Sequence, residues 1–163
     1  AQVADSSKIL VLTEERCPDT STFANYLPSS RIAMDPATLL QALDVGFRQG
    51  EFDLIFGLSR DANYVLIEQY AQASSYHLAY EGRHQYNSQG LLHTLKADRH
   101  VVSVIINQID NGTSEWTKII SQVPAINTQG SGAMVKSIIQ TTLACPEQSP
   151  GHLVSWLFKR RSL

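Results

Sequence analysis

The chain has 163 residues, of which 43% are hydrophobic and 17% are charged, and its formal net charge is −2. Those values are typical of one globular domain and exclude a disordered, highly charged segment. The small negative charge gives no electrostatic reason to expect nucleic acid as a partner, and no apolar run approaches the ~18 residues of a membrane-spanning helix.

Cysteine usage and the N-terminal residues both favour a cytoplasmic protein. The two cysteines, Cys17 and Cys145, are too few for a disulfide framework. Residues 1–8 have neither the basic start nor the apolar core of a secretory signal, and a mature, already processed N-terminus is the alternative that stays open. We therefore expect a cytoplasmic chain with two free thiols.

Strands and helices are predicted to alternate along most of the chain. Apolar runs predict strands over five ranges: 8–13, 31–34, 52–58, 76–80 and 101–106. Capping residues, proline and glycine predict the helices between them: 18–27, 35–49, 61–75 and 91–95. The polar stretch 81–88 is predicted to be a loop. Alternation of strands with helices favours a parallel sheet with helices on both faces.

After Asp110, two more helices are predicted over residues 116–123 and 133–143. We assign residues 1–145 to the α/β domain and residues 146–163 to a C-terminal tail or interdomain junction. This tail combines an apolar stretch with three cations, Lys159-Arg160-Arg161. Such a segment favours docking on the domain or a junction, with at most weak contact at a membrane surface.

The order of the first elements resembles the first half of a bacterial receiver domain, over residues 8–110. Glu14 and Glu15 follow the first strand, where receivers hold Mg²⁺ with two acids. Leu58 ends the third strand, where receivers carry the aspartate that accepts the phosphoryl group. The family's two other site positions fall on these residues: Tyr80 or Glu81 at the hydroxyl, and Asn107 or Gln108 at the lysine. The resemblance implies a three-layer, flavodoxin-like α/β fold with five parallel strands in the order 2-1-3-4-5 and an extra C-terminal helix.

Leucine at position 58 removes the oxygen nucleophile that phosphoryl transfer to a protein needs. The chain is therefore expected to be a non-enzymatic pseudo-receiver with no catalytic residue, metal or cofactor. It is similar to the N-terminal atypical receiver of tight-adherence pilus-assembly localisation ATPases. That resemblance implies a protein-protein interaction module for dimerisation or for localising a larger bacterial assembly. The way receivers pair implies an interaction face that includes Leu91, Leu92, Leu95 and Val102.

The main alternative is a small α/β enzyme, or a nucleotide or cofactor binder, that uses the carboxyl ends of the strands. Residues 130–137 approach a phosphate-binding loop, but Val135 replaces its second glycine. Asp35 ends a strand as a ribose-binding acid does, yet no glycine follows the first strand. The histidines lack metal-binding spacing: His77, His84, His93, His100 and His152.

Overall fold

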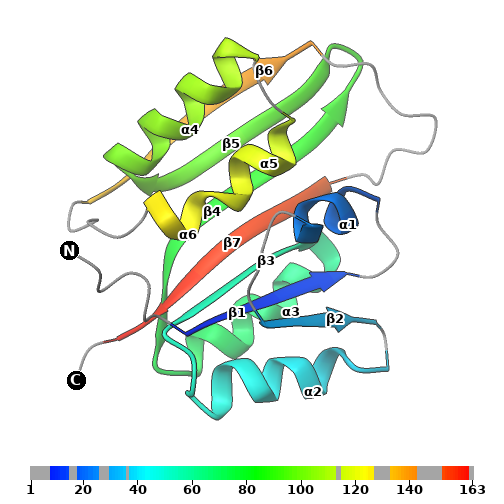
Figure 1. Cartoon of the computed structure of the whole chain (residues 1–163), viewed down its shortest axis with the longest axis vertical. Coiled ribbons are helices and arrows are strands. Elements are labelled where there is room, and N and C mark those ends of the chain that lie inside the picture. Colours follow the sequence, from blue (N-terminus) through cyan, green and yellow to red (C-terminus); the bar gives the residue numbers. More distant parts are fainter. Residues whose placement is uncertain are drawn as a thin grey trace.

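We describe the fold from a computed structural model, which describes residues 8–14, 18–25, 30–35, 37–112, 115–126, 133–142 and 152–161. They form a mixed sheet of seven strands in the order β2-β1-β3-β7-β4-β5-β6 (Figure 1). The strands are β1 (Ile9–Glu14), β2 (Ser30–Met34), β3 (Leu54–Arg60), β4 (Tyr76–Asn87), β5 (Gly90–Asp98), β6 (Met134–Thr141) and β7 (His152–Arg160). The helices are α1 (Pro18–Asn25), α2 (Leu39–Leu43) with its π-helical continuation η2 (Asp44–Arg48), α3 (Asp61–Gln72), α4 (Arg99–Asn111), α5 (Trp116–Ser121) and α6 (Val123–Ile126).

One end of the sheet is parallel and the other is antiparallel. β1 pairs in parallel with β2 and with β3. β7 is antiparallel to both β3 and β4, and β4, β5 and β6 are antiparallel in turn. The predicted flavodoxin-like sheet of five parallel strands in the order 2-1-3-4-5 is therefore wrong. The first three strands and the helices predicted over 18–27, 35–49, 61–75 and 116–123 are confirmed.

The departure from the prediction begins at a β-hairpin. Residues 81–88 were expected to form a polar loop, but β4 extends to Asn87, and a turn at Ser88 and Gln89 leads directly into β5. The Asn87 side-chain oxygen accepts a hydrogen bond from the Gln89 amide at 2.9 Å, and Gly90 follows with a φ of 131° that favours glycine. A two-residue turn makes the joined strands antiparallel, whereas a parallel partner needs a crossover of a dozen or more residues.

Two neighbouring segments also differ from their predicted structures. Residues 91–95 were predicted as a helix and lie in β5, while residues 101–106 were predicted as a strand and lie in α4. The Asp98 side chain caps α4 by accepting from the amide of His100, and Gly112 ends the helix with a φ of 64°. A short apolar run such as 101–106 does not by itself distinguish a buried strand from a buried helix.

The C-terminal part of the chain supplies the remaining strands. Residues 133–143 were predicted as a helix, but 134–141 form the edge strand β6, in which exposed and half-buried residues alternate. Residues 152–160, expected in a tail or junction, form β7 in the middle of the sheet. Its residues 153–158 are all buried because they alternate between two cores, one on each face of the sheet.

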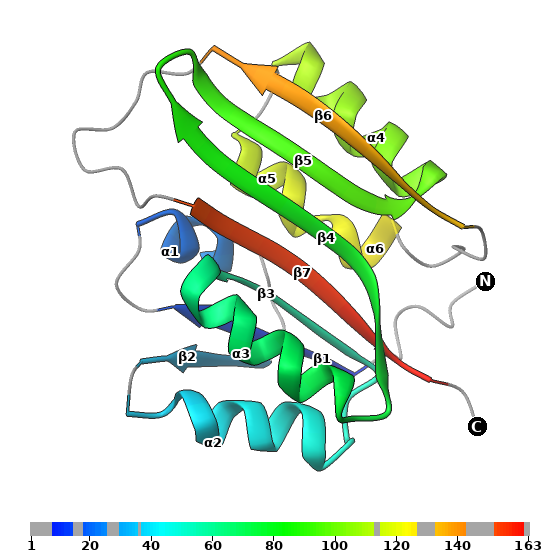
Figure 2. The same ribbon diagram turned by 180° about the vertical axis from the view of Figure 1, so that it is seen from behind.

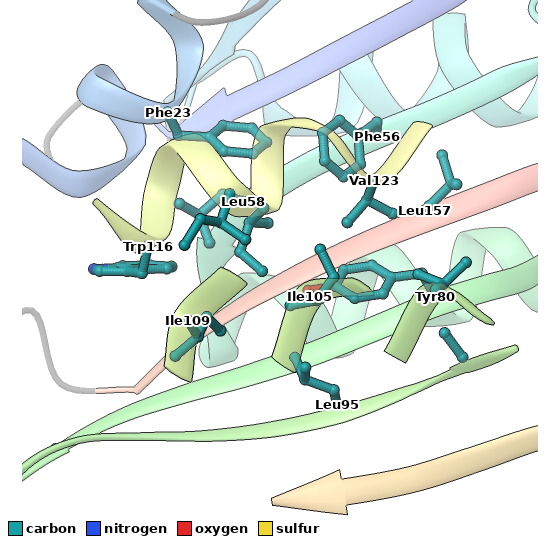
Figure 3. Close-up of a cluster of buried hydrophobic side chains, with 14 of the residues drawn as sticks. Phe23, Phe56, Leu58, Tyr80, Leu95, Ile105, Ile109, Trp116, Val123 and Leu157 are labelled. Atoms are coloured by element: carbon teal, nitrogen blue, oxygen red, sulfur yellow. The ribbon is translucent and has the colours of Figure 1, made fainter. Parts of the chain in front are cut away.

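Helices cover the two faces of the sheet unequally (Figures 1 and 2). α1, α4, α5 and α6 cover the first face, and α2 with η2 and α3 cover the second. The core under the first face includes the side chains shown in Figure 3: Phe23, Phe56, Leu58, Ile105, Trp116 and Leu157. The core under the second face includes these side chains: Leu12, Ile55, Tyr64, Trp156 and Phe158.

Across β5 and β6, the second face of the sheet carries no helix within the described part of the chain (Figure 2). We call this region the uncovered face. It consists of the alternate residues of the two strands: Leu92, Thr94 and Lys96 of β5 and Met134, Lys136, Ile138 and Gln140 of β6. Among the residues that the structure describes, the β5–β6 end of the sheet is thus one layer thinner than the β1–β3 end.

Candidate functional site

Four polar side chains form a hydrogen-bonded row inside the first core. Tyr80 and His84 come from β4, Ser155 from β7 and His93 from β5. The Tyr80 hydroxyl lies 2.7 Å from Ser155 Oγ, which lies 2.7 Å from His84 Nε2. His84 Nδ1 in turn lies 2.7 Å from His93 Nδ1. All four residues are fully buried, so this polar row links three adjacent strands through side chains as well as through the sheet.

Strand register places these side chains together. His84 lies opposite His93, and Gly82 lies opposite Ser155. Tyr80 precedes Gly82 by two residues and therefore points to the same face. A Cβ atom at position 82 would lie 2.3 Å from the Tyr80 hydroxyl and 2.7 Å from Ser155 Oγ. The polar row therefore requires glycine at position 82.

Two proton arrangements satisfy the polar row. A neutral imidazole carries one N–H, so one Nδ1 donates and the other accepts. If His84 Nδ1 donates, its Nε2 accepts from the Ser155 hydroxyl, which accepts from Tyr80. If His93 Nδ1 donates, His84 Nε2 donates to Ser155, whose own proton faces Tyr80 or the Gly82 carbonyl, 3.5 Å away. In both arrangements His93 Nε2 has no hydrogen-bond partner among the described residues.

Burial keeps both imidazoles neutral. The Trp116 ring packs against both, with its centroid 4.5 Å from that of His84 and 5.6 Å from that of His93. Burial lowers the pKa of His93 from its ordinary value of 6.5 to about 4. Burial, with smaller contributions from His93 and His152, holds the pKa of His84 well below 6.5. Burial also raises the pKa of Tyr80, so the row is uncharged at neutral pH.

The polar row can pass a proton between its members, but it offers no accessible nucleophile. A serine hydroxyl bonded to an imidazole is the pairing that activates serine for attack on a substrate. Ser155 is fully buried, and so are both histidines. A substrate outside the protein therefore does not reach the hydroxyl in this conformation.

A second polar cluster lies at the carboxyl ends of β1 and β3. The Glu14 carboxylate, 4% exposed, accepts from Arg60 Nε at 2.7 Å through one oxygen and from the Asn63 amide through the other. Nearby on α3, an Asp61 oxygen lies 3.7 Å from His152 Nδ1. Both Glu14 oxygens are thus engaged by neighbouring side chains. Glu15, the other acid of the predicted pair, lies outside the described residues.

The structure does not bring the predicted receiver positions together. Leu58 is buried in β3 opposite Ser155 of β7. Tyr80 lies in the polar row, inside a long strand instead of at the end of one. Asn107 is exposed on α4, which packs on β5 and β6. Since β3, β7 and β4 separate β5 from β1, Asn107 and Glu14 belong to different ends of the sheet.

The predicted interaction face is also divided by the sheet. Leu91 and Leu95 are fully buried in β5, and Val102 of α4 packs into the same core. These three side chains cannot line a surface. Leu92 points the other way and is half-buried on the uncovered face. The prediction was wrong because it placed 91–95 on a helix, where the leucines would share one side.

The sequence interpretation missed the two histidines and the serine of the polar row. The histidines were judged by metal-binding spacing, which they lack. The signal that identifies their relation is the turn: His84 lies four residues before Ser88, and His93 lies four residues after Gln89, so a hairpin at this turn pairs them. Ser155 carries no comparable local signal, because its contact with β4 spans 71 residues to His84.

An unpaired edge is the other candidate for function. β6 is the last strand of the sheet, and its outer edge pairs with no strand of the described chain. Ile138 is 63% exposed and Met134 36% exposed on the uncovered face. Lys136 is the single charged residue of β6, and the register with β5 runs without a bulge from Met134 to Thr141.

Comparisons with protein-family models, characterised proteins and solved structures found no match for this chain. Within the described residues, no helix is long and apolar enough to cross a membrane. The function must therefore be argued from the geometry of the polar row and of the β6 edge.

Proposed function

We propose that this protein is a non-enzymatic interaction module that pairs with a second copy of itself along the outer edge of β6. The observation that carries the proposal is the exposed, unpaired β6 edge with Ile138 and Met134 beside it. An edge strand presents free N–H and C=O groups that another strand can bond. Proteins usually protect such edges with proline, charges or bulges, and β6 has one lysine and neither of the other two.

A second copy fits this edge. In an antiparallel, two-fold pairing each subunit presents the same strand. Lys136 then faces its own counterpart only if the axis passes through that residue, so every other register avoids like charges across the pair. Ile138 and Met134 would continue onto the partner's uncovered face, which adds buried apolar surface to the main-chain hydrogen bonds.

The geometry favours this proposal over an enzyme or cofactor binder at the carboxyl ends of the strands. Glu14, the predicted functional acid there, has both oxygens bonded, to Arg60 and to Asn63. Ser155, the candidate nucleophile of the polar row, is fully buried. The exposed apolar side chains of β6, in contrast, are placed where a partner can reach them.

Self-association can be tested by sedimentation velocity or light scattering over a wide concentration series. We expect the wild-type chain to shift from monomer to dimer, and Ile138→Lys to stay monomeric because it adds a charge beside Lys136 of each subunit. Val65→Lys is the matched control, since Val65 is 60% exposed but lies on α3; it should dimerise like the wild type. A wild type that stays monomeric at the highest concentration, or equal losses in both variants, would refute the proposal.

A further inference from the structure

The polar row joins the thin end of the sheet to the rest of the molecule. Tyr80 and His84 connect β4 to Ser155 of β7, and His84 connects β4 to His93 of β5. On the β7 side of this connection, the strands have helices on both faces. On the β5 side, no described helix covers the second face (Figure 2). Side-chain bonds across β7, β4 and β5 thus matter most where the helical cover is least.

We propose that the polar row is an acid-sensitive switch, in which protonation of both buried imidazoles parts β5 from β4 and opens this end of the sheet. The contact between the two Nδ1 atoms decides the outcome. At 2.7 Å, it holds only while one nitrogen donates a proton and the other accepts. Two imidazolium rings would place N–H against N–H, and neither could accept.

The first proton alone leaves the hydrogen bonds intact. A protonated His84 donates from Nδ1 to His93 and from Nε2 to Ser155, both of which can accept. That proton still places a charge in a fully buried site, which burial disfavours. The switch therefore resists single protonation while the sheet is closed, and takes up two protons when the strands part.

The groups around the imidazoles offer no counter-charge within the described residues. His93 and His152 act on His84, and both disfavour its protonation; burial alone acts on His93. Tyr80 and Ser155 are neutral partners. Trp116 of α5 contacts both rings, and Ile139 of β6 lies opposite His93. The core cluster on this face takes only uncharged side chains from α4: Val101, Val102, Ile105, Ile106 and Ile109. The Asp19 carboxylate of α1 accepts a hydrogen bond from the hydroxyl of Tyr86, two residues beyond His84, and none from the imidazoles. Burial raises the pKa of Asp19, and the Glu115 carboxylate helps to raise it.

The switch has a calculable pH dependence. Imidazoles released into water regain an ordinary pKa of about 6.5. If opening takes up two protons, the opening constant should rise about 60-fold from pH 6 to pH 5, against about 8-fold for one proton. Strands β1 and β3 do not take part in this opening, so their amides should keep their protection.

Hydrogen exchange of the full-length chain, read by NMR and corrected for the intrinsic pH dependence of exchange, tests this inference. In the wild type, the β4 and β5 amides near His84 and His93 should show the 60-fold rise. In His93→Asn, whose amide can replace Nδ1 without titrating, the rise should fall to about 8-fold. His100→Asn, at an exposed site on α4, should behave as the wild type.

Two results would overturn the inference. One is the same pH dependence in the wild type and His93→Asn. The other is equal loss of protection in β1, β3, β4 and β5, which would report unfolding of the whole protein. Should His93→Asn fail to fold, imidazole NMR of the wild type still decides. Titration of both rings near pH 6.5 with unchanged β4–β5 protection contradicts the switch, and titration together with β4–β5 opening supports it.

Discussion

Gly82 faces Ser155 across the β4–β7 pair, and the Tyr80 hydroxyl occupies the space that a side chain at position 82 would need. The same residue thus has two consequences. It leaves β4 without a side chain at a central position, and it lets a tyrosine two residues away bond to the neighbouring strand. The bond between Tyr80 and Ser155 therefore depends on the absence of one methyl group.

We expect Gly82→Ala to lower the free energy of unfolding by ~1–3 kcal/mol, the cost of overpacking a core, because the new methyl must displace the Tyr80 hydroxyl. Urea denaturation measures this change. In a Tyr80→Phe background the same substitution should cost less, since the atom nearest to the methyl is gone. Equal costs in both backgrounds would show that Tyr80 does not occupy this space.

Strands β6 and β7 show that the position of a strand in the sheet, more than its composition, determines how much it contributes to stability. Both are rich in apolar residues and both come from the C-terminal third of the chain. β7 lies between β3 and β4, with residues 153–158 buried, while β6 lies at the edge with alternate residues exposed. Apolar side chains in the two strands should therefore differ strongly in their effect on stability.

Leu157→Ala should destabilise the protein by ~2–5 kcal/mol, because Leu157 is fully buried in the first core. Ile138→Ala should change the free energy of unfolding by no more than ~0.5 kcal/mol in the monomer, because Ile138 is 63% exposed. Thermal or urea denaturation of both variants compares them directly. Similar losses would mean that β6 is buried by a contact absent from the monomer, or that β7 is not central.

Local patterns predicted the elements that a continuous apolar run or a capped helix marks, and failed where polar and core residues alternate or where an apolar run fits two structures. Strands β1 and β3 were predicted correctly because a continuous apolar run is recognisable without knowing which strand it pairs with. Residues 81–88 were predicted to be a loop because Glu81, Arg83 and Gln85 are polar. In the structure Gly82 and His84 alternate with these residues and face the core. The role of β7 was beyond local reasoning, because its apolar run fits a docked tail as well as a central strand.

Of the two polar clusters, the sequence predicted one residue of the Glu14 cluster and none of the contacts of the polar row. Glu14 was identified as an acid at the end of the first strand, and the structure places it there, in contact with Arg60. The polar row was not identified, because its parts are ordinary residues that become a unit through register. Recognising a hairpin centred on Ser88 and Gln89 is enough to predict that His84 and His93 are paired. Predicting that Ser155 joins them also requires the position of β7 in the sheet.

At the scale of the whole molecule, acid sensitivity follows from the buried histidines. Unfolding returns His93 to its ordinary pKa of 6.5 from about 4 in the folded protein. Between those two values the unfolded chain binds a proton that the folded chain does not, so stability falls as the pH falls from 6.5 toward 4. The side chain is deeply buried, and its contribution requires no ion pair.

The free energy of unfolding of the wild type should be about 2–3 kcal/mol lower at pH 4.5 than at pH 7 through His93 alone. Urea denaturation at the two pH values gives the difference. His93→Asn should remove that part of the pH dependence, and His100→Asn should retain it. If the pH dependence is the same in wild type and His93→Asn, His93 is not held neutral by the fold.

The place of β7 in the sheet has a consequence for synthesis. β3 and β4 leave the ribosome long before the strand that will separate them, since β4 ends at Asn87 and β7 begins at His152. At roughly 5–20 residues per second, the segment between them takes on the order of several seconds to make. During that time both strands expose an unpaired edge. If β3 and β4 pair with each other, β7 cannot insert between them when it is made. Chaperones that hold nascent chains open, or slow translation of the segment between them, would therefore change the yield of this protein more than its final stability.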